Sequence, residues 1–135
     1  MKKETLRVKT HSRTDFVPLA KQVQDVVTKM GVRDGVCTLY VPHTTAAVFV
    51  NEGYDSDVMR DVQYALDRII PWSGGYAHSE GNAAAHIKAA VIGNSRQVLI
   101  EGGRLLLGRW EEIFFAEFDG PRSRELIVSV LESAP

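Results

Sequence analysis

The last third of the chain most constrains its fold, because four strand-like runs follow one another there without a helix between them. The runs are RQVLIE, RLLLG, EIFFAEFDG and RELIVSVLE, which begin at residues 96, 104, 112 and 124. They are rich in aliphatic and aromatic residues, and short glycine-bearing turns join them. Strands that succeed one another directly favour an antiparallel sheet over a doubly wound parallel one.

The preceding residues add strands and helices in mixed order. Three runs read as strands: KETLRVKTH at 3–11, GVCTLYV at 35–41 and AAVFVNE at 46–52. Three helices are expected, over 16–30 between the N-cap Asp15 and the stop Gly31, from the Asp55-Ser56-Asp57 cap to Pro71, and from the cap Asn82 to Gly93. We therefore expect a single α+β domain over residues 1–135, with a two-layer, largely antiparallel, β-sandwich-like core and about three helices.

Composition and charge exclude several classes of protein. Hydrophobic residues make up 44% of the chain and charged residues 24%, as in a folded globular domain. The formal net charge of −1 gives no basic field that would draw the chain to nucleic acid or to an anionic membrane. The longest apolar run, Ala46 to Val50, is too short to span a bilayer. Met-Lys-Lys-Glu leads into no apolar signal segment, and the single Cys37 excludes an internal disulfide, so a cytoplasmic location is expected.

Two of the four histidines enclose the stretch HSEGNAAAH at 78–86. His86 follows Asn82 by four residues, so both face the same side near the start of the expected third helix. A helix N-terminus suits an anion, and Asn82 is a candidate ligand for one. His78 precedes the helix by a loop that could bring it back beside His86.

A third histidine lies where a strand is interrupted, in VPHTTAAVFVNE. Pro42 cannot donate a ladder hydrogen bond, so His43 is expected at an exposed strand end, with Thr44 and Thr45 beside it as candidates for anion binding. Three neutral imidazoles with one open position form an established catalytic zinc arrangement. An H-x₇-H spacing is not a standard motif, however, and a lone histidine is more often a satisfied polar residue. Spacing alone does not decide between these readings, and His11 is expected at the surface.

A carboxylate falls on an apolar strand face near the C-terminus. In a strand that begins at residue 111, Glu117 shares a face with Ile113 and Phe115, so it needs a cation or hydrogen-bond donors. Arg122 and Arg124, beyond the DGP turn, are the natural candidates. Their guanidinium groups suit phosphate oxygens as well, so a structural Glu–Arg pair and a substrate site both stay open.

Three segments together resemble the YjbQ-like family, whose members are often described as secondary thiamine-phosphate synthases. They are HTTAAVFVNE, the H…N…HIKAAVIG block and GRLLLGRWEEIFFAEFDGPR, in that order along nearly the whole chain. The resemblance implies a small cytoplasmic α+β protein that forms a homotrimer. It also implies a divalent-metal site at His43, His78 and His86. The family commonly has Trp-Gln where this chain has Trp110-Glu111, which adds a carboxylate.

The reaction that the resemblance implies joins hydroxymethylpyrimidine diphosphate to a thiazole phosphate and releases diphosphate. A metal with Arg122 and Arg124 would hold the diphosphate, and Glu52, Asp55 or Glu117 would stabilise the cationic carbon or orient groups. Histidine ligands select zinc, whereas diphosphate chemistry usually employs magnesium, so zinc is expected first and magnesium or manganese second. Two alternatives stay open: a zinc-dependent hydrolase of a small phosphorylated metabolite, and a non-catalytic trimer that binds a metal or an anion.

Overall fold

Residues 1–134 are described by a computed structural model, in which they form three helices and eight strands. The elements in chain order are β1 (Lys2–Lys9), β2 (Asp15–Pro18), α1 (Ala20–Met30), β3 (Gly35–Tyr40), β4 (Ala46–Glu52), α2 (Ser56–Ile69), α3 (Ala83–Ile92), β5 (Ser95–Glu101), β6 (Arg104–Leu105), β7 (Glu111–Glu117) and β8 (Ser123–Glu132). None of the helices in this part of the chain has the length and apolar character needed to cross a membrane.

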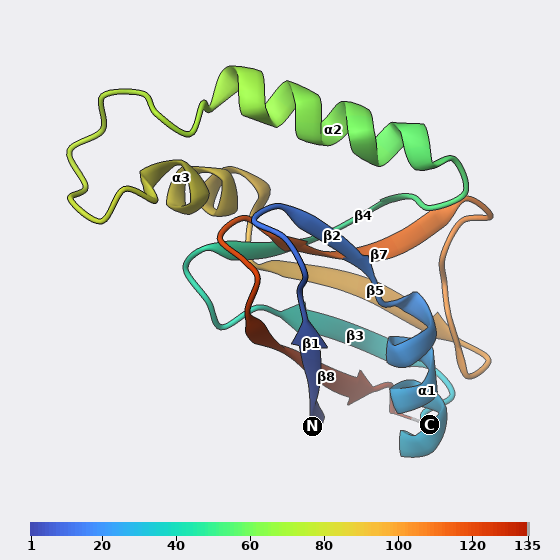
Figure 1. Ribbon diagram of the computed structural model, residues 1–135. Coiled ribbons are helices and arrows are strands. Elements are labelled where there is room, and N and C mark those ends of the chain that lie inside the picture. Colours follow the sequence, from blue (N-terminus) through green and yellow to red (C-terminus); the bar gives the residue numbers. More distant parts are fainter. Residues whose placement is uncertain (135) are drawn as a thin grey trace.

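The strands form two sheets (Figure 1). One sheet has the order β1-β8-β3-β5-β6 and the other the order β2-β7-β4. Every neighbouring pair in both sheets is antiparallel. The expected α+β fold with a two-layer, largely antiparallel core is therefore confirmed.

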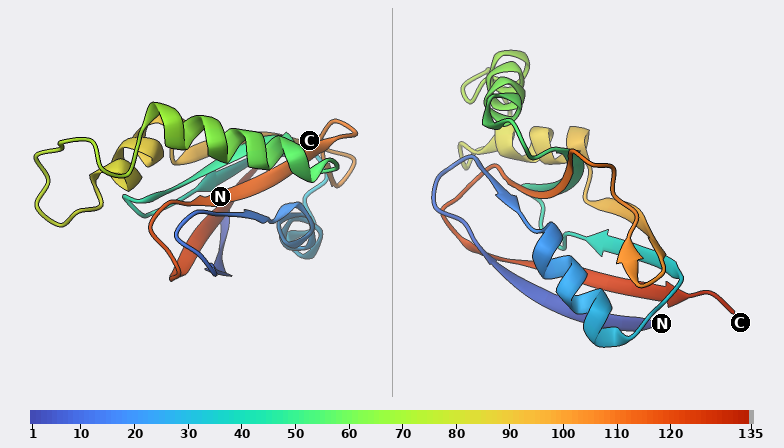
Figure 2. Two further views of the ribbon diagram at one scale, coloured as in Figure 1. Left: turned by 45° about the horizontal axis from the view of Figure 1, so that its top comes forward. Right: turned by 90° about the vertical axis from the view of Figure 1, so that its right-hand side faces the viewer.

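The main core lies between the two sheets. Strand side chains from both sheets contribute to it, and α1 adds Val23, Val26 and Val27, whose spacing places them on one face of the helix. Figure 2 shows α1 beside the sheets, on the side away from the other two helices. Burial of this apolar surface is the main term that stabilises the fold.

A second core covers the outer face of the three-stranded sheet. Phe114 and Ala116 of β7 point to this face, because successive side chains of a strand alternate between its two sides. Ala85 and Ala89 of α3 pack against it, and their small side chains let the helix approach the sheet closely. Both faces of β7 are therefore buried.

The helix expected over 16–30 is wrong in its first part. Residues 15–18 form β2, which pairs with β7 in the register Asp15↔Glu117 to Pro18↔Phe114, and α1 begins only at Ala20. Asp15 is not a helix cap, since its Oδ2 accepts the His11 N–H at 2.9 Å. The first turn of α1 is instead held from the sheet, where Glu112 Oε1 accepts the Ala20 N–H at 2.7 Å. Pairing with β7 outweighs the local helical pattern.

The strand expected over 104–108 is also too long. β6 contains only Arg104 and Leu105, and Leu107 N–H turns back to the carbonyl oxygen of Leu105 at 2.9 Å. The other expected strands and the second and third helices agree with the structure to within three residues at each end.

Helix α2 lies outside the body of the fold. Asp55 caps it as expected, because its Oδ1 accepts the Asp57 N–H at 2.9 Å. No α2 residue is buried, although Met59 and Leu66 contact the second core. Figures 1 and 2 show α2 as the outermost layer, with α3 between it and the sheets at one end.

Candidate functional site

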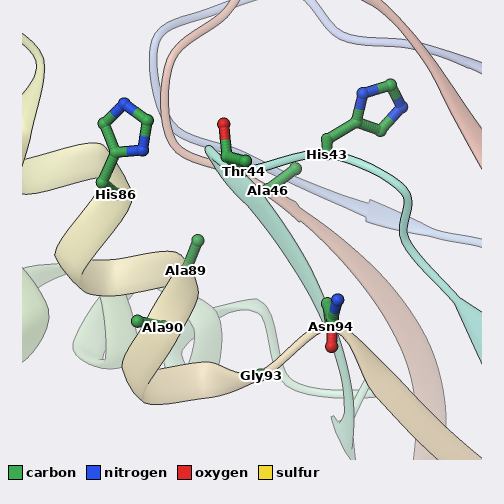
Figure 3. Close-up of a pocket in the computed structure, with 8 residues that line it drawn as sticks. All are labelled: His43, Thr44, Ala46, His86, Ala89, Ala90, Gly93 and Asn94. Carbon is green, nitrogen blue, oxygen red and sulfur yellow. The ribbon is translucent and has the colours of Figure 1, made fainter.

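A pocket lies between the β3–β4 loop and α3 (Figure 3). Its volume of about 320 Å³ is in the range of small-molecule sites. The residues that line it are His43, Thr44, Ala46, His86, Ala89, Ala90, Gly93 and Asn94. The pocket thus brings together two of the three histidines singled out in the sequence.

The backbone around this pocket is held by hydrogen bonds between distant segments. Val41 N–H donates to the carbonyl oxygen of Asn94 at 2.8 Å, and Val48 N–H donates to that of Gly93 at 3.1 Å. These bonds attach both sides of the loop to the C-terminal end of α3. The functional side chains of the loop therefore lie on a supported segment.

His86 has His78 as its neighbour. The two ring centroids are 5.1 Å apart and the rings are nearly perpendicular, at 80°. His78 Nε2 also lies 3.8 Å from a carboxylate oxygen of Glu80. The return of the loop that places His78 beside His86 is thus present in the structure.

Asn82 occupies the N-cap position of α3, but its side chain does not cap the helix. Its Nδ2 donates to Asp119 Oδ2 at 2.9 Å. Its Oδ1 is buried and has no hydrogen-bond partner within residues 1–134. A buried carbonyl oxygen without a donor is costly, so this atom suits a ligand or a metal ion.

His43 is oriented differently from the other two histidines. Its Nε2 accepts the Glu125 N–H at 2.9 Å, which leaves the proton of the neutral ring on Nδ1. Burial and the nearby positive charge of Arg124 hold the pKa of His43 below its usual value. In Figure 3 Thr44 lies between His43 and His86. His43 is therefore a neutral donor at Nδ1.

The three histidines are not gathered around one point in this chain. Within residues 1–134, no group of three or more His, Cys, Asp or Glu side chains is arranged to hold a metal ion. His78 and His86 lie together, while His43 is engaged with β8. A metal site with all three ligands stays a prediction.

Glu117 and Arg124 form a buried ion pair that is attached to the β3–β4 loop through Thr45. Arg124 Nε donates to Glu117 Oε1 at 2.8 Å, and Arg124 Nη2 donates to Glu117 Oε2 and to Thr45 Oγ1. Glu117 is fully buried and Arg124 is 6% exposed. Of the two arginines that the sequence offered, the structure pairs Arg124 with the carboxylate. The hydrogen bond from Arg124 to Thr45 thus ties the loop to this buried pair.

Thr10 completes this network and was missed in the sequence. Its Oγ1 lies 2.8 Å from Glu117 Oε1 and accepts the Arg122 N–H at 2.9 Å. Burial raises the pKa of Glu117, but the hydrogen bonds from Arg124, from the Asp119 N–H and from Thr10 outweigh it and hold the pKa below its usual value. The sequence did carry one signal for Thr10: in the expected first strand it has the same parity as Leu6 and Val8, so it is a polar residue on the apolar face.

Arg122 is exposed, unlike Arg124. Its Nη2 donates to Asp119 Oδ2 at 3.1 Å, and its Nε donates to the carbonyl oxygen of Asp119 at 2.7 Å. The same carboxylate oxygen of Asp119 accepts from Asn82. Asp119 thus links Arg122 to Asn82 at the start of α3, and the exposed guanidinium group of Arg122 can reach an anion in solvent.

Glu52 and Asp55 lie at the other end of β4. Glu52 Oε2 accepts the Asp55 N–H at 3.1 Å, and both residues line a cavity of about 470 Å³ with Tyr54 and Trp110, whose rings are 4.9 Å apart. Glu52 follows Ala46 by six strand positions, which is about 20 Å at 3.4 Å per residue. The chain therefore does not bring Glu52 and Asp55 to its histidines, whereas Glu117 pairs across the sheet with Ala46 of the histidine pocket. Glu111, which stands where the family commonly has Gln, lies at this end and accepts the Gly108 N–H at 2.6 Å.

Comparison with known proteins gives concordant results. The model of the UPF0047 protein YjbQ-like family matches residues 4–133. The UPF0047 protein YugU of Bacillus subtilis is 39% identical over 129 residues, which are 95% of this chain and 98% of that protein. A UPF0047 protein of Methanocaldococcus jannaschii is 41% identical over 125 residues, which are 93% of this chain and 91% of that protein.

Solved structures agree with the sequence comparisons. A YjbQ/UPF0047-family protein of Clostridium acetobutylicum is 43% identical and superposes with a TM-score of 0.93 over 95% of this chain and 99% of that one. A protein of Aeropyrum pernix is 36% identical, with a TM-score of 0.94 over 98% of this chain and all of its own. The chain therefore belongs to the YjbQ-like UPF0047 family.

Proposed function

We propose that this protein is a homotrimeric, metal-dependent transferase with thiamine-phosphate synthase activity as a secondary reaction. The observation that carries the proposal is the pocket lined by His43, Thr44 and His86. His78 lies next to His86, and the buried Asn82 oxygen has no hydrogen-bond partner within residues 1–134. The resemblance of the sequence motifs to the family supplies the reaction class.

The reaction sets clear demands on the site. The bond between the pyrimidine methylene carbon and the diphosphate oxygen breaks, and the diphosphate keeps the electron pair. The thiazole ring nitrogen forms the new bond to that carbon, and no proton is transferred. The site must therefore bind a highly charged anion and stabilise a carbon with developing positive charge.

His78 and His86 are the best-placed metal ligands. Zinc binds imidazole nitrogens at about 2.0–2.1 Å, and ring centroids 5.1 Å apart are compatible with one shared ion. Nitrogen donors favour zinc over magnesium or manganese, and Asn82 Oδ1 adds an oxygen donor nearby. A bound metal would offset the charge of the leaving diphosphate. His43 would join as a ligand only after its ring leaves the Glu125 N–H; as placed, its Nδ1 is suited to donate to the substrate.

The anion would be held by the exposed groups of this end of the molecule. Thr44 is exposed in the loop, and Arg122 presents a half-exposed guanidinium group beside Asp119. Arg124 is occupied by Glu117 and Thr45, so its contribution is to support the loop. Arg122 is therefore the arginine that we assign to the substrate.

The separation of the two ends of β4 is the reason to include the homotrimer. Glu52 and Asp55 lie about 20 Å from the histidine pocket along the strand, too far to act on the same small substrate. A second copy could bring its acidic end against the pocket in a head-to-tail ring. The complete site would then contain residues of two subunits.

Metal content and transferase activity test the proposal together. Wild-type protein should retain zinc and form thiamine phosphate from the two precursors, and His86→Ala should lose both. His11→Ala is the matched control, because His11 is exposed and lines none of the pockets described above. Unchanged zinc stoichiometry in His86→Ala would contradict the metal assignment.

Mixed oligomers test the shared site. Light scattering should give about three times the chain mass of 15.0 kDa. His86→Ala and Asp55→Ala should each be inactive alone. After co-refolding in equal amounts they should recover about a quarter of the wild-type activity, since a quarter of the interfaces would join two intact halves. A monomer, or no recovery after mixing, would refute the shared site.

A zinc-dependent hydrolase is the second candidate. It is favoured by the nitrogen donors of the pocket, because zinc with an open position activates water. Release of inorganic phosphate from a panel of phosphomonoesters, without formation of thiamine phosphate, would support it. Retained zinc with neither activity would indicate a non-catalytic trimer that binds a metal or an anion.

A further inference from the structure

A second cavity lies on another side of α3. It is bounded by the β1–β2 loop, by the C-terminal half of α2 and by α3, and its volume is about 680 Å³. The residues that line it are Ser12, Arg13, Thr14, Gln63, Asp67, Pro71, Trp72 and Lys88. None of them lines the histidine pocket. Lys88 follows His86 by two helical positions, about 200° around the axis, so the two side chains leave the helix on different sides.

Lys88 is the unusual residue of this cavity. Its side chain is 4% exposed, whereas lysine is almost never buried unless it is paired. Its Nζ donates to Asp67 Oδ1, and the carboxylate of Asp67 is half exposed. An ammonium group has three N–H donors, and this is its one hydrogen bond within residues 1–134. Donors are thus left for a ligand in the cavity.

Arg13 adds a second cation to the same cavity. Its guanidinium carbon lies 4.1 Å from the centroid of the Trp72 ring, and the cation–π contact holds it over that ring. Arg13 forms no ion pair with a carboxylate in the described part of the chain. With Lys88 and Arg13 against Asp67, the cavity carries a formal charge of +1 in a chain whose net charge is −1.

We propose that this cavity is a second binding site, which takes a small phosphate ester with a flat ring. A guanidinium fork and an ammonium group are the usual protein donors to phosphate oxygens. One face of the Trp72 indole carries Arg13, so a ligand ring would pack on the part of the indole surface that Arg13 leaves free in the cavity. In the bound state the phosphate shares Lys88 with Asp67 and is approached by Arg13. This proposal does not rest on the proposed function of the histidine pocket.

The competing explanation is purely structural. No residue of α2 is buried, so the Lys88–Asp67 pair could serve only to hold α2 against α3. The two explanations differ in the effect of Asp67→Asn. A phosphate that competes with the Asp67 carboxylate binds more tightly to the variant, whereas a purely structural pair gives a lower thermal midpoint and no change in phosphate binding.

Trp72 provides a local signal for the test. The chain has two tryptophans, so Trp110→Phe leaves Trp72 as the single fluorophore. This variant is titrated at low ionic strength with inorganic phosphate, phenyl phosphate and phenol. We expect saturable changes in Trp72 emission, with phenyl phosphate bound about tenfold more tightly than phosphate because of one ring contact. Absence of a saturable signal with both phosphates would overturn the proposal.

Further substitutions in the Trp110→Phe background locate the binding. Lys88→Met and Arg13→Gln should each weaken phenyl phosphate binding about tenfold or more, and Asp67→Asn should strengthen it severalfold. Arg13 is exposed, so Arg13→Gln keeps the test valid if Lys88→Met does not fold. His86→Ala, on the other side of α3, should leave the affinity unchanged. Loss of binding in His86→Ala, with no effect of Arg13→Gln, would assign the phosphate to the histidine pocket and refute the second site.

Discussion

Removal of Arg124 should separate the structural arginine from the exposed one. Arg124→Met leaves Glu117 as a fully buried carboxylate without its cation, and it also removes the hydrogen bond to Thr45. Removing one partner of a buried ion pair costs about 3–5 kcal/mol. Since a domain of 135 residues loses about 4 °C of thermal midpoint per kcal/mol, the expected decrease is about 12–20 °C.

Arg122→Met is the matched control for this experiment. It removes the same side chain at a position that is half exposed and paired with Asp119. An exposed pair contributes about 0–1 kcal/mol, so the midpoint should fall by no more than about 4 °C. The double variant Glu117→Gln with Arg124→Met should be more stable than Arg124→Met alone. The buried charge is then absent, and the amide oxygen still accepts the Asp119 N–H.

The assay is thermal unfolding followed by circular dichroism at one fixed chain concentration, because association shifts the midpoint. Equal decreases for Arg122→Met and Arg124→Met would refute the assignment of Arg124 to the buried pair. A double variant no more stable than Arg124→Met would show that the unpaired charge of Glu117 is not the source of the cost.

Three further predictions concern the loop, the cap of α2 and the turn before β8. The lowered pKa of His43 means that, as the pH falls, this histidine takes up a proton in the unfolded chain before it does so in the folded protein, so stability should fall as the pH drops below 6.5. His43→Gln should flatten this dependence. Equal slopes of thermal midpoint against pH for the variant and the wild type would contradict the prediction. Asp55→Ala removes the N-cap of α2 and should destabilise the helix by about 0.5–2 kcal/mol, measured as faster amide hydrogen exchange in α2. Unchanged exchange would argue against the cap. Gly120→Ala places a Cβ 2.5 Å from the Ser12 carbonyl oxygen and should lower the free energy of unfolding by about 1–3 kcal/mol, measured by thermal unfolding. In the control Gly108→Ala the new Cβ meets the movable end of the Glu111 side chain, so stability should be nearly unchanged. Equal losses of stability in the two variants would refute the packing argument.

Local patterns were sufficient for most secondary structure. The apolar spacing after Asp55 and the stop at Pro71 predicted α2 closely, because capping and proline act within a few residues. The helix expected over 16–30 was wrong in its first part because distant residues, and not local ones, decide the structure there. Phe16 fits the helical apolar spacing with Leu19 and Val23, although Phe and Val also favour strands, and the pairing of residues 15–18 with β7 selects the strand.

The sequence by itself determined that Glu117 needs a cation, since alternation placed it with Ile113 and Phe115 on an apolar face. It did not determine which arginine pairs with it, because both follow the same turn. The tertiary structure decided for Arg124, which β8 directs inward beside Thr45. It also brought in Thr10, which directly follows β1 and is more than a hundred residues away along the chain.

The histidines show the same division. The strand break at Pro42 and the start of α3 at Asn82 could be recognised from residue types, so the candidate positions were accessible to local reasoning. Their relative placement was not. His78 meets His86 through a loop return, while His43 turns to the Glu125 N–H, because distances between side chains depend on how the sheets and α3 pack and not on spacing along the chain. Chain chemistry thus selects the candidates for a site, and packing decides which of them meet.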